Sequence, residues 1–148
     1  MKAVLQRVSQ ASVSVDSRIV GQIGKGVLVF LAVGKEDSEA DADYLVKKLI
    51  QLRMFEDKEG NLNLSPQEVG AAFLVISQFT LYGDCRKGRR PSFDRAADPQ
   101  KAEKLYDFFI EQLKKQGMNV ASGQFRAMMN VQLVNEGPVT LIVESRPR

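Results

Sequence analysis

The sequence predicts a single mixed α/β domain over residues 1–148, in which two main helices cover one face of mixed β-sheets, a three-layer β/β/α arrangement. Two observations support this fold class. Short apolar segments either alternate or run without interruption, as strands do, and two longer segments repeat their apolar residues at helical spacing. The 44% apolar and 26% charged fractions of the 148-residue chain are those of an ordinary globular domain.

The first half of the chain is predicted to begin with strands at 2–8, 11–16, 19–23 and 27–33. The run 27–33 is apolar on both faces, which indicates a central strand covered on each side. Asp37 or Ser38 then caps a helix whose first turn is acidic, as the positive end of a helix dipole favours. The apolar stripe of this helix is Ala42, Leu45, Leu49 and Leu52.

The second half is predicted to alternate loops with buried elements. The segment 55–65 is a polar turn region, and Ser65-Pro66 begins a helix that Gly70 limits to about one turn. A buried strand at 72–76 continues into 77–82. Asp98-Pro99 begins the second main helix, which Gly117 ends. Two further strands are expected at 128–134 and 139–143, and no element is assigned to 119–122.

Missing residue types narrow the chemistry. The chain has no histidine and a single cysteine, Cys85, so Ser-His-Asp and Cys-His catalysis is excluded and neither a metal site nor a cofactor is expected. One cysteine also fits a reducing, cytoplasmic setting. No apolar run approaches the roughly 20 residues that a membrane helix requires, so no membrane contact is expected.

A basic loop is predicted at 83–95. It holds five basic residues against two acidic ones, a large share of a net charge of +3 for the whole chain. Such a loop suits RNA phosphates, and Phe93 adds an aromatic face. The alternative is a solvated loop with no partner. The expected RNA contacts are Arg86, Lys87, Arg89 and Arg90.

The stretch Ser77-Gln78-Phe79-Thr80 lies at the end of a predicted buried strand, where site residues of α/β sheets commonly gather. Strand geometry would send Ser77 and Phe79 to one face and Gln78 and Thr80 to the other. Hydroxyls, an amide and backbone N–H groups there could stabilise a tetrahedral oxyanion. The alternative is ordinary hydrogen bonding at a strand end. Thr80 as a nucleophile would need a base, and no histidine exists to supply one.

The stretch Asn135-Glu136-Gly137-Pro138-Val139-Thr140 lies between the last two predicted strands. Glycine adopts backbone angles that other residues avoid, and proline has no N–H. The Gly-Pro step therefore leaves backbone carbonyls without a neighbouring amide donor. On local grounds it is interpreted as a turn joining two strands.

Taken together, these two stretches resemble the D-aminoacyl-tRNA deacylase family. The segments 88–93 (Gly-Arg-Arg-Pro-Ser-Phe) and 1–8 (Met-Lys-Ala-Val-Leu-Gln-Arg-Val) resemble it too, so the resemblance covers the whole length. It implies a cytoplasmic homodimer with active sites at the subunit interface. Its substrate is aminoacyl-tRNA, and it hydrolyses the ester between a D-amino acid, or glycine on mischarged alanine tRNA, and the tRNA.

The resemblance also implies roles for individual residues. A cis peptide between Gly137 and Pro138 would enter the partner's active site, where its carbonyls leave no room for an L side chain. Arg7 would support that loop, and Asn135 belongs to the same motif. Ser77, Gln78, Phe79 and Thr80 would form the pocket floor, with backbone N–H groups near Phe79 and Thr80 as oxyanion donors. Phe125 and Met129 would pack against the terminal adenosine or the aminoacyl group.

Two mechanisms and two other functions stay open at this point. Thr80 could act as the nucleophile, or the 2′-OH of the tRNA could assist an attacking water; the absence of histidine favours the second. The competing function is a non-catalytic tRNA- or RNA-binding module, for which the basic loop argues. A third possibility is a structural dimer in which the Gly-Pro segment is only an interface latch.

Overall fold

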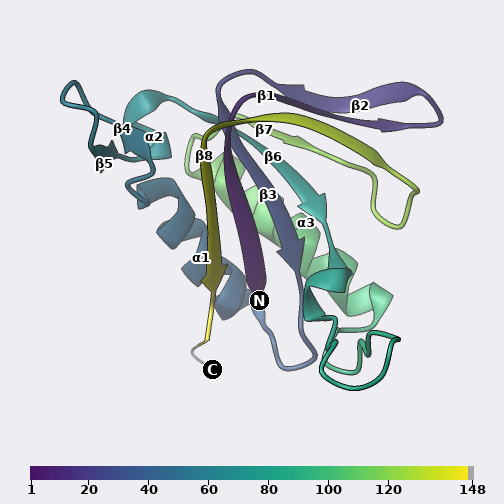
Figure 1. Ribbon diagram of the computed structural model, residues 1–148. Coiled ribbons are helices and arrows are strands. Elements are labelled where there is room, and N and C mark those ends of the chain that lie inside the picture. Colours follow the sequence, from purple (N-terminus) through teal and green to yellow (C-terminus); the bar gives the residue numbers. More distant parts are fainter. Residues whose placement is uncertain (147–148) are drawn as a thin grey trace.

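The computed structural model describes residues 1–146, and Figure 1 shows their arrangement. The elements follow in the order β1 (Lys2–Val15), β2 (Arg18–Ile23), β3 (Gly26–Ala32), α1 (Glu39–Gln51), β4 (Phe55–Glu56), β5 (Leu62–Leu64), α2 (Pro66–Val69), β6 (Ala72–Ser77), the 3₁₀ helix η1 (Phe79–Tyr82), α3 (Pro99–Lys115), β7 (Val120–Ser122) and β8 (Asn130–Glu144). Within residues 1–146, no helix is both long and apolar enough to cross a membrane.

The long strand β1 organises the main sheet, whose order is β2-β1-β3-β6-β7 with β8 paired to β1 as well. The first half of β1 pairs with β3, its second half pairs with β2, and β8 runs antiparallel along both halves. Strands β3, β6 and β7 are parallel to one another. The sheet folds over on itself, since a Cβ on Gly21 of β2 would lie 2.6 Å from the Ser122 carbonyl oxygen of β7.

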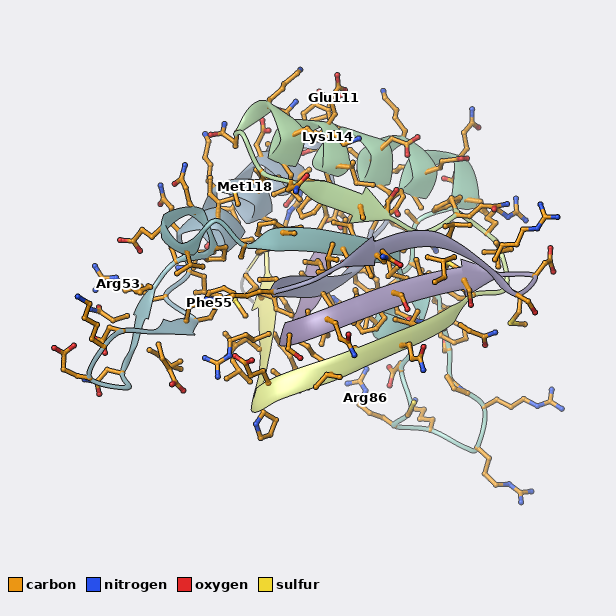
Figure 2. The ribbon with its side chains drawn as sticks, turned by 90° about the horizontal axis from the view of Figure 1, so that it is seen from above. Arg53, Phe55, Arg86, Glu111, Lys114 and Met118 are labelled. Carbon is orange, nitrogen blue, oxygen red and sulfur yellow. The ribbon has the colours of Figure 1, made fainter. Side chains whose placement is uncertain are left out.

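Two apolar cores separate three layers. The larger core lies between the sheet and the helices, and β3 and β6 contribute Val27, Val29, Phe73 and Val75 to it. The residues that alternate with these, including Leu28 and Leu74, face the second core, which the folded-over strands β1 and β8 cover. Figure 2 shows α3 and β8 on opposite sides of the molecule, with Glu111 and Lys114 on the outer side of α3. The predicted β/β/α fold class is confirmed.

The helices begin where the sequence places their caps. The backbone N–H of Ser38 donates to the Asp41 carboxylate at 2.9 Å, and the backbone N–H of Lys101 donates to the Asp98 carboxylate at 3.0 Å. The short helix α2 begins at Pro66 after Ser65 and ends at Gly70, which has a left-handed φ of 64°. These local signals suffice because capping satisfies the backbone groups that a helix leaves free.

Four predicted strands are in fact two. The segments 2–8 and 11–16 form the single strand β1, and 128–134 and 139–143 form the single strand β8. The predicted turn at the Gly-Pro step is therefore wrong. Both halves of β8 pair with the same partner, from Lys2↔Glu144 to Ser14↔Asn130, so the chain passes through the Gly-Pro step without reversing direction.

Three smaller predictions are also wrong. The segment 55–65 contains a short hairpin of β4 and β5, and 119–122 contains the parallel strand β7. Strand β6 ends at Ser77, and the chain then turns into η1. Because Phe79 and Thr80 belong to a 3₁₀ helix, the expected alternation of faces over 77–80 does not occur.

Candidate active site

A cavity of about 660 Å³ lies beyond the end of β6. Four separate segments close it: the end of β3, the end of β6 with η1, the segment from Phe93 into the start of α3, and the stretch from after β7 into the start of β8. The residues around it are Ala32, Val33, Ile76, Ser77, Gln78, Phe79, Phe93, Ala96, Ala97, Pro99, Ala102, Phe125, Arg126, Ala127, Met129 and Val131. Three of the predicted floor residues, Ser77, Gln78 and Phe79, thus share one cavity with Phe125 and Met129, whereas Thr80 is not among its lining residues.

The η1 turn presents backbone donors at the edge of this cavity. Gln78 is anchored by its own N–H, which donates to the Leu31 carbonyl at 2.8 Å. Phe79 and Thr80 are the first two residues of η1, where N–H groups have no carbonyl partner within the helix. Among the residues the structure describes, no hydrogen bond from either N–H is found. These two amides are free to bind an oxygen atom of a ligand.

The η1 turn is held in place by its side chains. Phe79 is 55% exposed and contacts Phe93 edge-to-face, with ring centroids 5.1 Å apart. The hydroxyl of Thr80 accepts a hydrogen bond from the side-chain amide of Gln78. The neighbour of Thr80 in this turn is therefore an amide, which cannot take up a proton as a base would.

The cavity wall carries almost no charge. Arg126 is the one titratable side chain among the described residues that line it. The described lining therefore includes no carboxylate, lysine or thiol that could move a proton.

The far wall is aromatic and apolar. Phe125 lies against Tyr106, with ring centroids 5.9 Å apart. Tyr106 donates to the Val75 carbonyl at 2.8 Å, and burial raises the pKa of its phenol to about 12. Met129 reaches this wall over Gly123, where a Cβ would lie 2.6 Å from the Met129 sulfur. The Phe125 and Met129 pair provides an apolar surface on which a flat ring could stack.

The Gly-Pro segment forms a bulge on β8. Between the pairs Gln6↔Thr140 and Val8↔Asn135, the single residue Arg7 on β1 faces four residues on β8. The Gly137–Pro138 peptide bond is cis, Gly137 has φ +132°, and both residues are exposed.

Arg7 and Asn135 brace this bulge from within. The Arg7 side chain is 4% exposed; its Nε donates to the Glu136 carbonyl at 3.0 Å and an Nη donates to the Met54 carbonyl at 3.2 Å. The Asn135 side-chain oxygen accepts from the Val139 N–H at 3.1 Å, and its amide donates to the Thr140 hydroxyl at 2.9 Å. Side chains thus fix the bulge while its tip stays open to solvent.

The bulge and the cavity lie far apart in one chain. Arg7 pairs with Val27 and Val27 with Phe73, so the bulge is level with Phe73, whereas Ser77, the first predicted floor residue of the cavity, is the last residue of β6. Four residues along the strands and three strand spacings across the sheet correspond to roughly 13 Å and 14 Å, or about 19 Å diagonally. Figure 1 agrees: β8 bends at the end of the sheet opposite to the tip of β6. The predicted site residues therefore form two separate groups.

The basic loop leaves the body of the protein between η1 and α3 (Figure 1). Its base is closed by two hydrogen bonds between Asp84 and Ser92, of 2.8 and 3.0 Å. Arg86, labelled in Figure 2, pairs with Asp84 at 2.6 Å, which lowers the pKa of that carboxyl to about 2. Lys87, Arg89 and Arg90 are exposed. Part of the predicted RNA-binding charge, that of Arg86, is thus already neutralised within the loop.

Several cavity residues were not predicted from the sequence. One of them is Arg126, which has a left-handed φ of 64°. Two others are Ala96 and Ala97, which lie at the cavity where an isolated β-bridge joins Gly34 to Ala96. One local signal could have pointed to Arg126: the stretch from Gly123 to Arg126 lies between two strands and mixes apolar with polar residues. No local signal marks the two alanines.

Comparison with known proteins agrees over nearly the whole chain. The family model described as D-Tyr-tRNA(Tyr) deacylase matches residues 4–144. The D-aminoacyl-tRNA deacylase of Syntrophobacter fumaroxidans is 58% identical over 146 residues, which are 99% of this chain and 98% of that protein. That of Symbiobacterium thermophilum is 56% identical over 98% of this chain and 96% of its own length.

The same fold is found among solved structures. A solved structure described as c-Myc DNA Unwinding Element Binding Protein superposes with a TM-score of 0.93 at 38% identity, covering 99% of this chain and 100% of that one. Membership of a family of ester hydrolases favours an enzyme over a non-catalytic RNA-binding module. The chain belongs to the D-aminoacyl-tRNA deacylase family.

Proposed function

We propose that this protein hydrolyses the ester between a D-amino acid and the terminal adenosine of tRNA, and likewise removes glycine from mischarged alanine tRNA. The observation that carries the proposal is the pair of unpartnered amides, Phe79 and Thr80, at the edge of a cavity without a side-chain base. Two neighbouring N–H groups without acceptors suit the oxyanion that forms when an ester carbonyl is attacked.

The chemistry follows from what the cavity offers. Water attacks the ester carbonyl, and the negative charge that develops on its oxygen is held by the two amides. The neighbouring 2′-OH of the substrate assists the water, because the wall has no group of its own that takes a proton. Collapse of the tetrahedral intermediate breaks the bond to the ribose 3′-oxygen, and the proton lost by the attacking water passes through the 2′-OH to that leaving oxygen. The products are the free amino acid and uncharged tRNA.

Selection against L-amino acids is assigned to the Gly137-Pro138 bulge. A side chain could be selected by a pocket, but the bulge offers main-chain carbonyls, and Gly137 has no side chain. Placed against the α-carbon of the substrate, these carbonyls accept from the amino group of a D-residue and exclude the side chain of an L-residue.

This selector has to come from a second copy of the chain. The estimated 19 Å between bulge and cavity keeps one chain from using its own bulge. Two features support dimerisation through this region: β8 pairs with one strand, β1, among the described strands, and it exposes Ile142 by 72% and Val134 by 46%. An edge strand with exposed apolar residues is a surface that proteins ordinarily cover.

The remaining parts of the proposal concern the tRNA. Lys87, Arg89 and Arg90 project from the basic loop near the cavity and contact phosphates of the acceptor end. Arg86 joins them where the RNA displaces its partner Asp84. We place the activity in the cytoplasm, where charged tRNA is used.

The deciding experiment is a deacylation assay that compares enantiomers. Purified protein is mixed with D-tyrosyl-tRNA and, separately, with L-tyrosyl-tRNA, without added metal, and release of labelled tyrosine is followed. Rapid loss of the D-ester alone supports both the hydrolysis and the selection against L-amino acids. Equal rates on both esters would refute the role of the bulge, and tRNA binding without ester loss would refute the enzyme.

A further inference from the structure

A buried carboxylate behind the cavity joins three parts of the chain. Asp37 is 6% exposed, and its Oδ2 accepts from the Gly34 N–H at 2.6 Å and from the Tyr82 hydroxyl at 3.3 Å. The same oxygen lies 2.7 Å from the ammonium group of Met1. None of these four residues belongs to the site described above.

The first connection leads to η1. Tyr82 is the last residue of that turn and is 9% exposed. Burial first, and then the charge of Asp37, raises the pKa of its phenol, so the hydroxyl remains a donor. The amide donors of Phe79 and Thr80 lie on the same single turn, and Gly83 closes it with a hydrogen bond to Thr80 at 2.9 Å.

The second connection leads to the opposite wall of the cavity. Gly34 follows β3, and its loop is tied to the segment before α3 by two hydrogen bonds. Lys35 donates to the Arg95 carbonyl at 3.1 Å, and Ala97 donates to the Val33 carbonyl at 2.9 Å. Val33 and Ala97 both line the cavity. One carboxylate thus fixes the turn that carries the oxyanion donors and the wall that faces it.

We propose that Asp37 is a positioning residue of the active site, which sets the η1 turn against the 33–37 loop through the Tyr82 hydroxyl and the Gly34 amide. The inference rests on the proposed function for its catalytic part, because it assumes that the η1 amides act on substrate. Its structural part, the order of η1, is measurable without any substrate.

The test uses Asp37→Asn and a matched control, Asp41→Asn. Asp41 is 7% exposed and lies in the first turn of α1, and its partners are Ser38, Ser145 and Arg146. Ser145 also accepts from the Met1 ammonium, but among the described residues none of these three partners is hydrogen-bonded to η1. Both variants lose a buried ionic contact, and both should lower the melting temperature by about 5 to 15 °C. Each is assayed for kcat and KM on D-tyrosyl-tRNA and for amide hydrogen exchange in peptides covering 78–83.

The expected results separate positioning from general stability. Asp37→Asn should lower kcat by about tenfold or more with KM nearly unchanged, because small misplacements of a catalytic group are costly. It should also speed exchange of the η1 amides. Asp41→Asn should leave kcat and that exchange as in the wild type. Equal effects of both variants, or wild-type kcat and exchange in Asp37→Asn, would overturn the proposal.

Two milder variants keep the test valid if Asp37→Asn does not fold. Tyr82→Phe removes only the hydroxyl, and Gly34→Ala adds a Cβ 2.7 Å from that hydroxyl and 3.1 Å from the Asp37 carboxylate. Both should lower kcat and speed η1 exchange, and unchanged values in both would refute the proposal. Inactive wild-type protein would refute the proposed function. The hydrogen-exchange data would still decide whether Asp37 holds the η1 turn in place.

Discussion

Gly137→Ala should weaken chiral discrimination more than it weakens the fold. A φ of +132° lies outside the conformations that an alanine adopts readily, and the added Cβ would lie 2.9 Å from Val139 Cγ2 and 3.0 Å from the Val139 nitrogen. Backbone strain of this kind costs about 1–3 kcal/mol, and the close contacts add to it, so a total of about 2–4 kcal/mol is expected. For a chain of this length that lowers the melting temperature by about 5 to 15 °C.

Relief of this strain requires the bulge to move. A shift of about 1 Å in a group that positions substrate can change rates on the order of 100-fold. The ratio of kcat/KM for D- over L-tyrosyl-tRNA should therefore fall by at least about tenfold, measured at a temperature where the variant is fully folded.

Gly60→Ala is the matched control. Gly60 has a φ of +82°, so alanine is strained there too, but no atom lies within 4 Å of its Cβ position, and it belongs to the β4–β5 turn. It should lose about 1–2 kcal/mol of stability and keep the wild-type D/L ratio. An unchanged ratio in folded Gly137→Ala protein would refute the assignment of selectivity to the bulge.

Three other predictions test the remaining parts of the site. Thr80→Ala should retain kcat within about threefold, since its hydroxyl contacts an amide, and a loss of about 10³-fold in folded protein would restore Thr80 as nucleophile. Replacing Arg89 and Arg90 by alanine should reduce the slope of log kcat/KM against log salt by roughly 1.4 to 1.8 and spare kcat, whereas an unchanged slope would remove the loop from the RNA interface. The hydrogen bond from Arg146 lowers the pKa of Asp41, so its carboxylate stabilises the fold above the ordinary aspartate pKa and this contribution fades as pH falls further. The melting-temperature gap between wild type and Asp41→Asn should accordingly narrow from about pH 5 to about pH 2, and a constant gap would argue against the linkage.

The parts of the fold that sequence predicts well are those with local causes. The caps at Ser38 and Asp98 and the stop at Gly70 are all found where backbone chemistry requires them. The strand 27–33 is recognisable because burial on both faces leaves a continuous apolar run. Each of these signals is complete within one or two turns of chain, so no knowledge of partners is needed.

The parts that sequence misses depend on contacts between distant segments. The Gly-Pro step looks like a turn locally, and only its pairing with both halves of β1 shows that β8 continues through it. The switch from β6 to η1 after Ser77 has no marker such as glycine or proline. Ala96 and Ala97 line the cavity through a bridge to Gly34, some sixty residues earlier in the chain. Alanines carry no chemical signal that could have indicated this role.

The geometry divides two tasks between two ends of the molecule. In the proposed function, the η1 amides and the cavity provide for ester cleavage, and the bulge provides for selection between mirror images. The bulge at Gly137 is open, braced by Arg7 and Asn135, and has no cavity of its own. Because about 19 Å separates them in one chain, the proposed function requires a second copy to bring a bulge to each cavity. Selectivity and activity should therefore be separable in a mixed dimer of one Gly137→Ala chain and one chain with a blocked cavity. The only open cavity in this dimer belongs to the Gly137→Ala chain, and the only unaltered bulge belongs to the other chain. The mixed dimer should keep the wild-type D/L ratio if the bulge acts on the partner's cavity, and should lose it if each bulge acts on its own chain.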